Sequence, residues 1–130
     1  MRKVVKNKKI PQPRGPYSPA IISNGFVFVA GQGPINPKTN QLELGAISTE
    51  TRRTLQNIEA ILESAGSSMK DVVRVGVFLS DMKNFVAMNK VYAEFFPKDP
   101  PARTTVGADL PKIKVEIDCI ARVRKSRKRK

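Results

Sequence analysis

The stretch KIKVEIDCIARVR, residues 112–124, has the strict alternation of a β-strand with one buried and one polar face. The apolar set that points to one side is Ile113, Val115, Ile117, Cys119, Ala121 and Val123. Lys114, Glu116, Asp118, Arg122 and Arg124 point to the other. The chain therefore contains a sheet, and something must pack on the apolar side of this strand.

Two upstream segments have helical spacing and can supply that cover. The first begins at Ser48, a capping residue, and ends at Gly66, with Glu50 in its first turn. Its apolar residues recur every three or four positions: Thr51, Leu55, Ile58, Leu62 and Ala65. The second is capped by Asp81, is stopped by Pro97 and presents Phe85, Met88, Tyr92 and Phe95. Each helix has one apolar stripe, so each packs against one neighbouring layer.

Further strands are expected around these helices. Residues 72–79 form a β-branched-rich central strand, 103–106 a short strand, and 4–5 a possible first strand. The runs 20–22 and 26–30 are joined by Asn24-Gly25, the strongest short hairpin signal. The second of these runs is apolar at both parities, which predicts burial on both faces. Prolines exclude regular structure from residue 11 to about 20, and residues 31–45 are expected to be a loop.

The resulting order, β-β-β-α-β-α-β-β, predicts an α+β fold in which one sheet carries both helices on one face. A chain of 130 residues has no third layer for the opposite face, so self-association is expected. We divide the chain into a basic N-terminal arm (1–9), a domain (10–123) and a disordered basic tail (124–130).

Charge and composition limit the possible functions. The net charge of +13 comes from the two ends: twelve basic residues lie in 2–9 and 122–130, and the other twelve are balanced by all 11 acidic residues. The chain has no histidine, which removes imidazole bases, Ser-His and Cys-His pairs and most zinc sites. The single cysteine, Cys119, excludes an intramolecular disulfide and favours a reducing compartment, and we expect it to be a buried, inert thiol. No apolar run is long enough to span a membrane.

Five residues are candidates for a site, each with a plainer alternative. Arg103, after a proline-rich linker, suits bidentate capture of a carboxylate, or is a solvated surface arginine. Glu116 could hold a water as general base, or pair with a neighbouring strand. Tyr17 could cover a ligand or simply pack, and Gly31 could admit a ligand close to its backbone or make a turn. Asn89 lies in the middle of the second helix, where solvent exposure is the plainer interpretation.

Taken together, seven segments resemble the RidA (YjgF-type) family of reactive-intermediate deaminases, also called L-PSP endoribonucleases. They are GPYS (15–18), VAGQ (29–32), PINPKT (34–39), TLQNI (54–58), NKVYAEFF (89–96), PART (101–104) and KVEIDCIA (114–121). They occur in the family's order across roughly residues 10–123. Two positions that vary within the family, Ala30 and Thr105, are read as tuning substrate preference.

The resemblance implies a chorismate-mutase-like subunit in a homotrimer, with a central barrel of three sheets and ligand clefts between subunits. It implies hydrolysis of 2-imino or enamine acids, such as 2-iminobutyrate and 2-iminopropionate, to 2-oxo acids and ammonia, without cofactor or metal. Arg103 would then hold the substrate carboxylate and Glu116 the attacking water. Tyr17 would close the pocket, backbone groups around Gly31 would hold the imine side, and Asn89 would be supporting.

Two other functions stay open. The basic arms would attract RNA in a salt-dependent way, although no aromatic residue is interleaved with them for base stacking. The cleft could also belong to a non-catalytic binder or a chaperone-like regulator. The expected location is the cytoplasm. The nucleus is the next candidate, because the tail resembles an import signal, and the mitochondrion ranks lower, because Pro11 and Pro13 interrupt any amphipathic helix in the arm.

Overall fold

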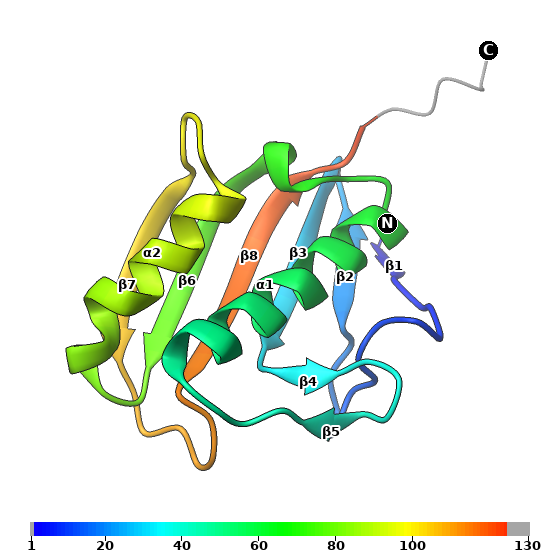
Figure 1. Ribbon diagram of the computed structural model, residues 1–130. Helices are drawn as coiled ribbons and strands as arrows, with labels where there is room; N and C mark the ends of the chain where they lie inside the picture. The colour runs from blue at the N-terminus through cyan, green and yellow to red at the C-terminus, as the bar shows by residue number, and fades with distance from the viewer. Residues whose placement is uncertain (1, 125–130) are drawn as a thin grey trace.

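The computed structural model describes residues 2–124 and has two sheets and two helices (Figure 1). The strands are β1 (Arg2–Val4), β2 (Ala20–Ser23), β3 (Phe26–Gln32), β4 (Ile35–Asn36), β5 (Gln41–Leu42), β6 (Val72–Leu79), β7 (Ala102–Gly107) and β8 (Val115–Arg122). The helices are α1 (Ile47–Ser64) and α2 (Phe85–Phe95), with 3₁₀ turns at Met69–Asp71 and Met82–Asn84. The tail predicted to be disordered lies outside the described residues, except for Arg124.

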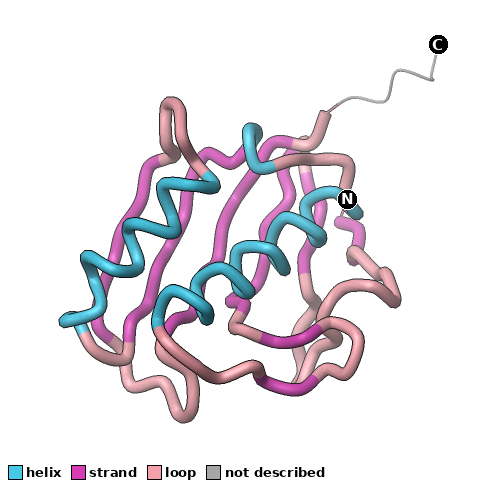
Figure 2. Tube along the Cα trace, in the orientation of Figure 1, coloured by secondary structure: helices cyan, strands magenta, loops and turns pink. Residues whose placement is uncertain are grey.

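Six strands form the main sheet in the order β1-β2-β3-β8-β6-β7. Only β6 and β7 run parallel, because α2 connects them as a crossover, and the other neighbours are antiparallel. Both helices lie on the same face of this sheet, α1 across β8 and β3 and α2 beside β6 and β7, as Figures 1 and 2 show. The predicted α+β fold, one sheet with two helices on one face, is confirmed.

The hydrophobic core lies between the sheet and the helices. The alternation predicted for the last strand is confirmed, because Val115, Ile117, Cys119 and Ala121 are all buried. The helical stripe is confirmed as well, since Thr51, Leu55, Ile58 and Leu62 are all buried in α1. The Asn24-Gly25 turn closes the β2–β3 hairpin with φ angles of 53° and 84°, and Gly66 follows α1 with a φ of 79°.

The prediction that the second apolar run is buried on both faces is wrong for the single chain. Val27 and Val29 are buried, but Phe26 and Phe28 are 36% and 44% exposed. They lie on the sheet face opposite the helices, which we call the open face, and no described element covers it. The apolar pattern was correct, but a single chain buries only one of its two sides.

Three predictions about where elements lie and begin are also wrong. Residues 31–45 are not all loop, because β4 and β5 pair as a short hairpin across Asn40, whose φ is 60°. α1 begins at Ile47 and not at Ser48, and its N-cap, Ala46, makes no side-chain hydrogen bond. The Glu50 carboxylate instead accepts the backbone N–H of Gly45 at 3.1 Å. Asp81 caps the 3₁₀ turn before α2 and not α2 itself, by accepting the N–H of Lys83.

Candidate functional site

Gly31 and Glu116 lie in direct contact between β3 and β8. The register of these strands shifts between Val29 and Gln32, which is the signature of a bulge. A Cβ at Gly31 would lie 2.2 Å from Oε2 of Glu116 and 2.9 Å from its Cδ. Glycine is therefore needed here for close approach and not for its backbone angles. The structure brings together these two predicted site residues.

The environment of Glu116 favours its protonated form. Burial raises the pKa of its carboxyl group, and the carboxylate of Asp118 raises that pKa further. Asp118 lies two residues along β8 on the same open face and accepts the N–H of Gly76 at 3.1 Å. A carboxylate with a raised pKa beside an exposed backbone segment can act as a general base nearer to neutral pH than an ordinary glutamate.

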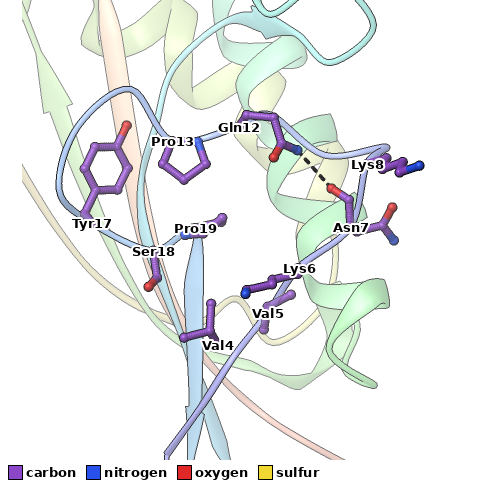
Figure 3. A pocket seen from close by; sticks show the side chains of 10 residues that line it. All are labelled: Val4, Val5, Lys6, Asn7, Lys8, Gln12, Pro13, Tyr17, Ser18 and Pro19. Carbon is purple, nitrogen blue, oxygen red and sulfur yellow. Dashed lines mark hydrogen bonds between the residues drawn. The ribbon is translucent and has the colours of Figure 1, made fainter.

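Tyr17 lies close to Gly31, at the end of a proline-rich loop. Its hydroxyl accepts the backbone N–H of Arg14 at 3.2 Å, and its side chain is about half exposed. With Gly31 and Gln32 it lines a small recess. Its ring also forms one wall of a cavity of about 500 Å³ in which Lys6 and Pro19 take part (Figure 3). Tyr17, Gly31 and Glu116 thus lie together as one half of the candidate site.

Arg103 lies on the other face of the sheet from Glu116. It pairs with Val75 across the parallel β6–β7 ladder, whereas Glu116 pairs with Phe78 across β6–β8. Val75 and Phe78 differ in parity along β6, so the side chains of Arg103 and Glu116 leave opposite faces of the sheet. Arg103 is on the helix face. A single chain does not bring the predicted carboxylate-binding residue and the predicted water-holding residue into one pocket.

The Arg103 guanidinium lies against α2. Its central carbon is 4.5 Å from the ring centroid of Tyr92 and 5.7 Å from that of Phe85. Asn89 lies between these two positions on the helix, and its Oδ1 is buried without a partner among the described residues. Burial raises the pKa of Tyr92 to about 12, although the neighbouring Arg103 acts in the opposite direction. Asn89 therefore belongs to the Arg103 half and not to the Gly31 half.

Several residues that support these two halves had no predicted role, or a different one. Tyr92 was predicted only as part of an apolar stripe. Thr105, predicted to tune substrate preference, lies on the Arg103 face and has a buried Oγ1 without a described partner. Asn57 is fully buried and donates through Nδ2 to the carbonyls of Gly33 and Ile35, at 3.1 and 2.7 Å, which fixes the segment after Gly31. The sequence signals for Asn57 were its place in the TLQNI segment and its position as a polar residue beside Ile58 in the apolar stripe.

Glu50 supports the start of β8 in a similar way. Its fully buried carboxylate accepts the N–H of Lys114 at 2.7 Å and lies 3.6 Å from the Lys114 ammonium. A buried carboxylate is tolerated only when it is paired and hydrogen-bonded, and Glu50 meets both conditions. It anchors the strand two residues before Glu116.

Other chemistry is limited within the described part of the chain. Cys119 is buried, as expected, and burial together with the Asp118 carboxylate raises the pKa of its thiol to about 12. Among residues 2–124, no group of three or more cysteine, aspartate or glutamate side chains could hold a metal ion. Neither helix in these residues is long and apolar enough to cross a membrane.

Comparison with known proteins gives consistent matches over nearly the whole chain. A family described as endoribonuclease L-PSP matches residues 7–123. A RutC family protein of Pyrococcus horikoshii is 49% identical over 123 residues, which are 93% of this chain and 98% of the relative. A 2-iminobutanoate/2-iminopropanoate deaminase of Dermatophagoides farinae is 40% identical over 121 residues, 92% and 94% of the two chains.

A solved structure extends the match to three dimensions. The crystal structure of E. coli TdcF with bound serine superimposes with a TM-score of 0.87 at 33% identity. The match covers 95% of this chain and 99% of that one. Fold and sequence therefore agree on the relatives of this protein.

Proposed function

The chain belongs to the endoribonuclease L-PSP family, and on that premise we propose that it hydrolyses reactive 2-imino acids to 2-oxo acids and ammonia. A relative named for this activity is 40% identical over nearly the full length. The observation that carries the proposal is the contact of Glu116 with Gly31, where a carboxylate of raised pKa faces a backbone with no side chain. Such a group can hold and activate a water molecule next to a small ligand.

We further propose that the active site forms between subunits of a homotrimer. Arg103 and Glu116 leave opposite faces of one sheet, so one substrate can meet both only if two copies contribute. The open face carries the exposed Phe26 and Phe28, which favours burial against another copy. In the proposed assembly the open faces form a central barrel. Arg103 of one subunit then adjoins Tyr17, Gly31 and Glu116 of the next.

The reaction needs little beyond orientation. Arg103 would bind the substrate carboxylate through two parallel N–H donors, which fixes the imine carbon. Glu116 would take a proton from water as the oxygen attacks this carbon and pass it to the imine nitrogen, giving a neutral carbinolamine. Glu116 would then move the proton of the new hydroxyl group to the nitrogen, so that the carbonyl forms as the C–N bond breaks and ammonia leaves. Because the imine carbon is already electrophilic, one carboxylate and a held substrate suffice.

The test is ammonia release from 2-iminobutyrate generated in situ by a threonine dehydratase. We expect acceleration by the wild type and its loss in Arg103→Ala. Arg52→Ala is the matched control, because Arg52 forms an exposed ion pair with Glu94 on the helix surface. The absence of acceleration by the wild type would refute the enzyme proposal. Binding of 2-oxobutyrate without turnover would support the non-catalytic binder instead.

The assembly has its own test. Sedimentation should give three times the chain mass of 14.4 kDa. Stable monomers at micromolar concentration would contradict the shared site.

RNA binding is a second candidate. Arg2, Lys3, Lys6, Lys8 and Lys9 are basic, and none of them forms an ion pair with a described residue. They would give salt-sensitive, nonspecific association with RNA. RNA cleavage that survives removal of residues 1–9 and 125–130, but is lost in Glu116→Ala, would favour this function over deamination.

We propose the cytoplasm as the location, because a lone buried thiol suits a reducing compartment. A relative from fission yeast is described as mitochondrial. A fluorescent fusion of the full chain tests this: accumulation in mitochondria or in the nucleus would contradict the proposal.

A further inference from the structure

The side chain of Arg103 packs against one face of α2. Phe85, Asn89 and Tyr92 are spaced by four and three residues, so they project from the same side of the helix. The guanidinium lies over both aromatic rings, nearer to Tyr92 at 4.5 Å than to Phe85 at 5.7 Å. Two rings of one helix therefore hold a side chain that comes from a different element, β7.

The nearer ring is itself rigidly supported. Tyr92 is 6% exposed, and its ring packs on Phe96 with centroids 4.7 Å apart. Burial raises the pKa of its hydroxyl to about 12, so the side chain stays neutral at physiological pH. A neutral, buried and packed ring is a good platform for a cation, because its π face attracts the guanidinium. Phe85, at 36% exposure, is the looser wall.

Most of the N–H groups of the Arg103 side chain remain available in this arrangement. The side chain forms no ion pair with another residue of the described chain, and the Tyr92 hydroxyl, whose pKa the guanidinium lowers, can take up only one of its N–H groups. Stacking uses the flat face of the guanidinium and leaves its N–H edge available. A carboxylate needs that edge in a fixed plane, because bidentate capture requires two parallel N–H donors.

We infer that Tyr92 is a positioning residue for carboxylate binding: it orients Arg103 through its ring, without itself touching the ligand. The inference rests on the proposed role of Arg103 as the carboxylate-binding residue. An arginine without this support would have to fix several freely rotating bonds on binding, and ligand affinity would fall accordingly.

The test compares Tyr92→Leu, which removes the ring, with Tyr92→Phe, which keeps it and removes only the hydroxyl. The measured quantities are the Kd of 2-oxobutyrate and the NMR signal of the Arg103 Nε–H group, which a stacked ring shifts upfield. We expect Tyr92→Leu to weaken binding about 5- to 30-fold and to abolish the upfield shift. Tyr92→Phe should stay within about 2-fold of the wild type.

Two controls separate positioning from general packing. Phe96→Leu disturbs the same aromatic pair without touching the guanidinium, and should leave the Nε–H signal in place. In an Arg103→Ala background, Tyr92→Leu should cause no further loss of affinity, because the ring would act only through Arg103. An additional loss there would overturn the inference. So would unchanged binding and an unchanged NMR signal in Tyr92→Leu.

If Tyr92→Leu does not fold, Phe85→Leu keeps the inference testable, because Phe85 is part of the same stack but partly exposed. We expect a smaller upfield shift of the Nε–H signal and weaker binding; no change in either would refute the two-ring stack. These readouts do not require turnover. If the wild type binds 2-oxobutyrate but does not hydrolyse the imine, the proposed function is refuted. The positioning role of Tyr92 is then still decided by the binding and NMR data.

Discussion

Replacing Gly31 with alanine tests the core of the site. The new Cβ would lie 2.2 Å from Oε2 of Glu116, and real Cβ atoms essentially never come within 3.0 Å of such a neighbour. The carboxylate must then move by roughly 1 Å to restore van der Waals contact. Gly31 does not have a positive φ, so alanine adds no backbone strain. The displaced atoms are the far end of a flexible side chain, so stability should barely change.

Activity should change strongly, because a displacement of about 1 Å can cost roughly 100-fold in rate. We therefore expect Gly31→Ala to lower kcat/KM for 2-iminobutyrate by about 100-fold, or about 2.7 kcal/mol of transition-state stabilisation. The assay is ammonia release with threonine dehydratase, alongside urea denaturation of both proteins.

Gly45→Ala is the matched control. Its Cβ would meet nothing nearer than Thr49 at 3.8 Å, an ordinary contact, so its activity should equal that of the wild type. If Gly31→Ala retained more than about a third of wild-type activity with its fold intact, the assignment of Glu116 as the water-activating group would be wrong.

Three further changes probe the carboxylate pair, the open face and the buried support. Asp118→Asn removes a charge that raises the pKa of Glu116, so the acid limb of the kcat/KM profile should move to lower pH; an unmoved limb, or one at higher pH, would contradict the assigned cause. Asparagine can still accept the N–H that Asp118 accepts now. If the proposed homotrimer forms, Phe28→Asp on the open face should dissociate it in sedimentation, whereas Val86→Asp, at an exposed site on α2, should not. An intact oligomer in the Phe28→Asp variant would place the interface elsewhere. Asn57→Ala should lower the free energy of unfolding by about 2 kcal/mol in urea at fixed protein concentration, because two buried carbonyls lose their donor. A loss below about 0.5 kcal/mol would mean that other groups satisfy those carbonyls.

Local patterns in the sequence were sufficient to predict the main-sheet strands, the two helices and the layer arrangement. The alternation of residues 112–124 predicted β8, and the stripe from Thr51 to Ala65 predicted α1. The Asn24-Gly25 turn was also recognisable, because both residues accept the positive φ that it requires. Each of these signals depends on a repeat of two or about 3.6 residues within one segment, which neighbouring side chains along the chain encode directly.

Short-range signals failed where a residue's role depends on a distant partner. Ser48 looked like a helix cap, but the Glu50 carboxylate binds the Gly45 N–H and the distant start of β8. Residues 35–42 looked like loop, because two-residue strands carry no detectable period. Tyr92 looked like core, and only its contact with Arg103 distinguishes it from an ordinary packed aromatic.

The sequence by itself thus determined the six strands of the main sheet, the two helices, their common face and the five candidate site residues proposed from it. Only the tertiary structure decided how those residues are grouped. Arg103 lies on β7 and Glu116 on β8, so whether their side chains share a sheet face depends on the register of each strand against β6. A shift of either register by one residue would turn its side chain to the opposite face. The approach of Gly31 to Glu116 depends on a register shift between β3 and β8. These are long-range pairings, and no periodicity within a single segment contains them.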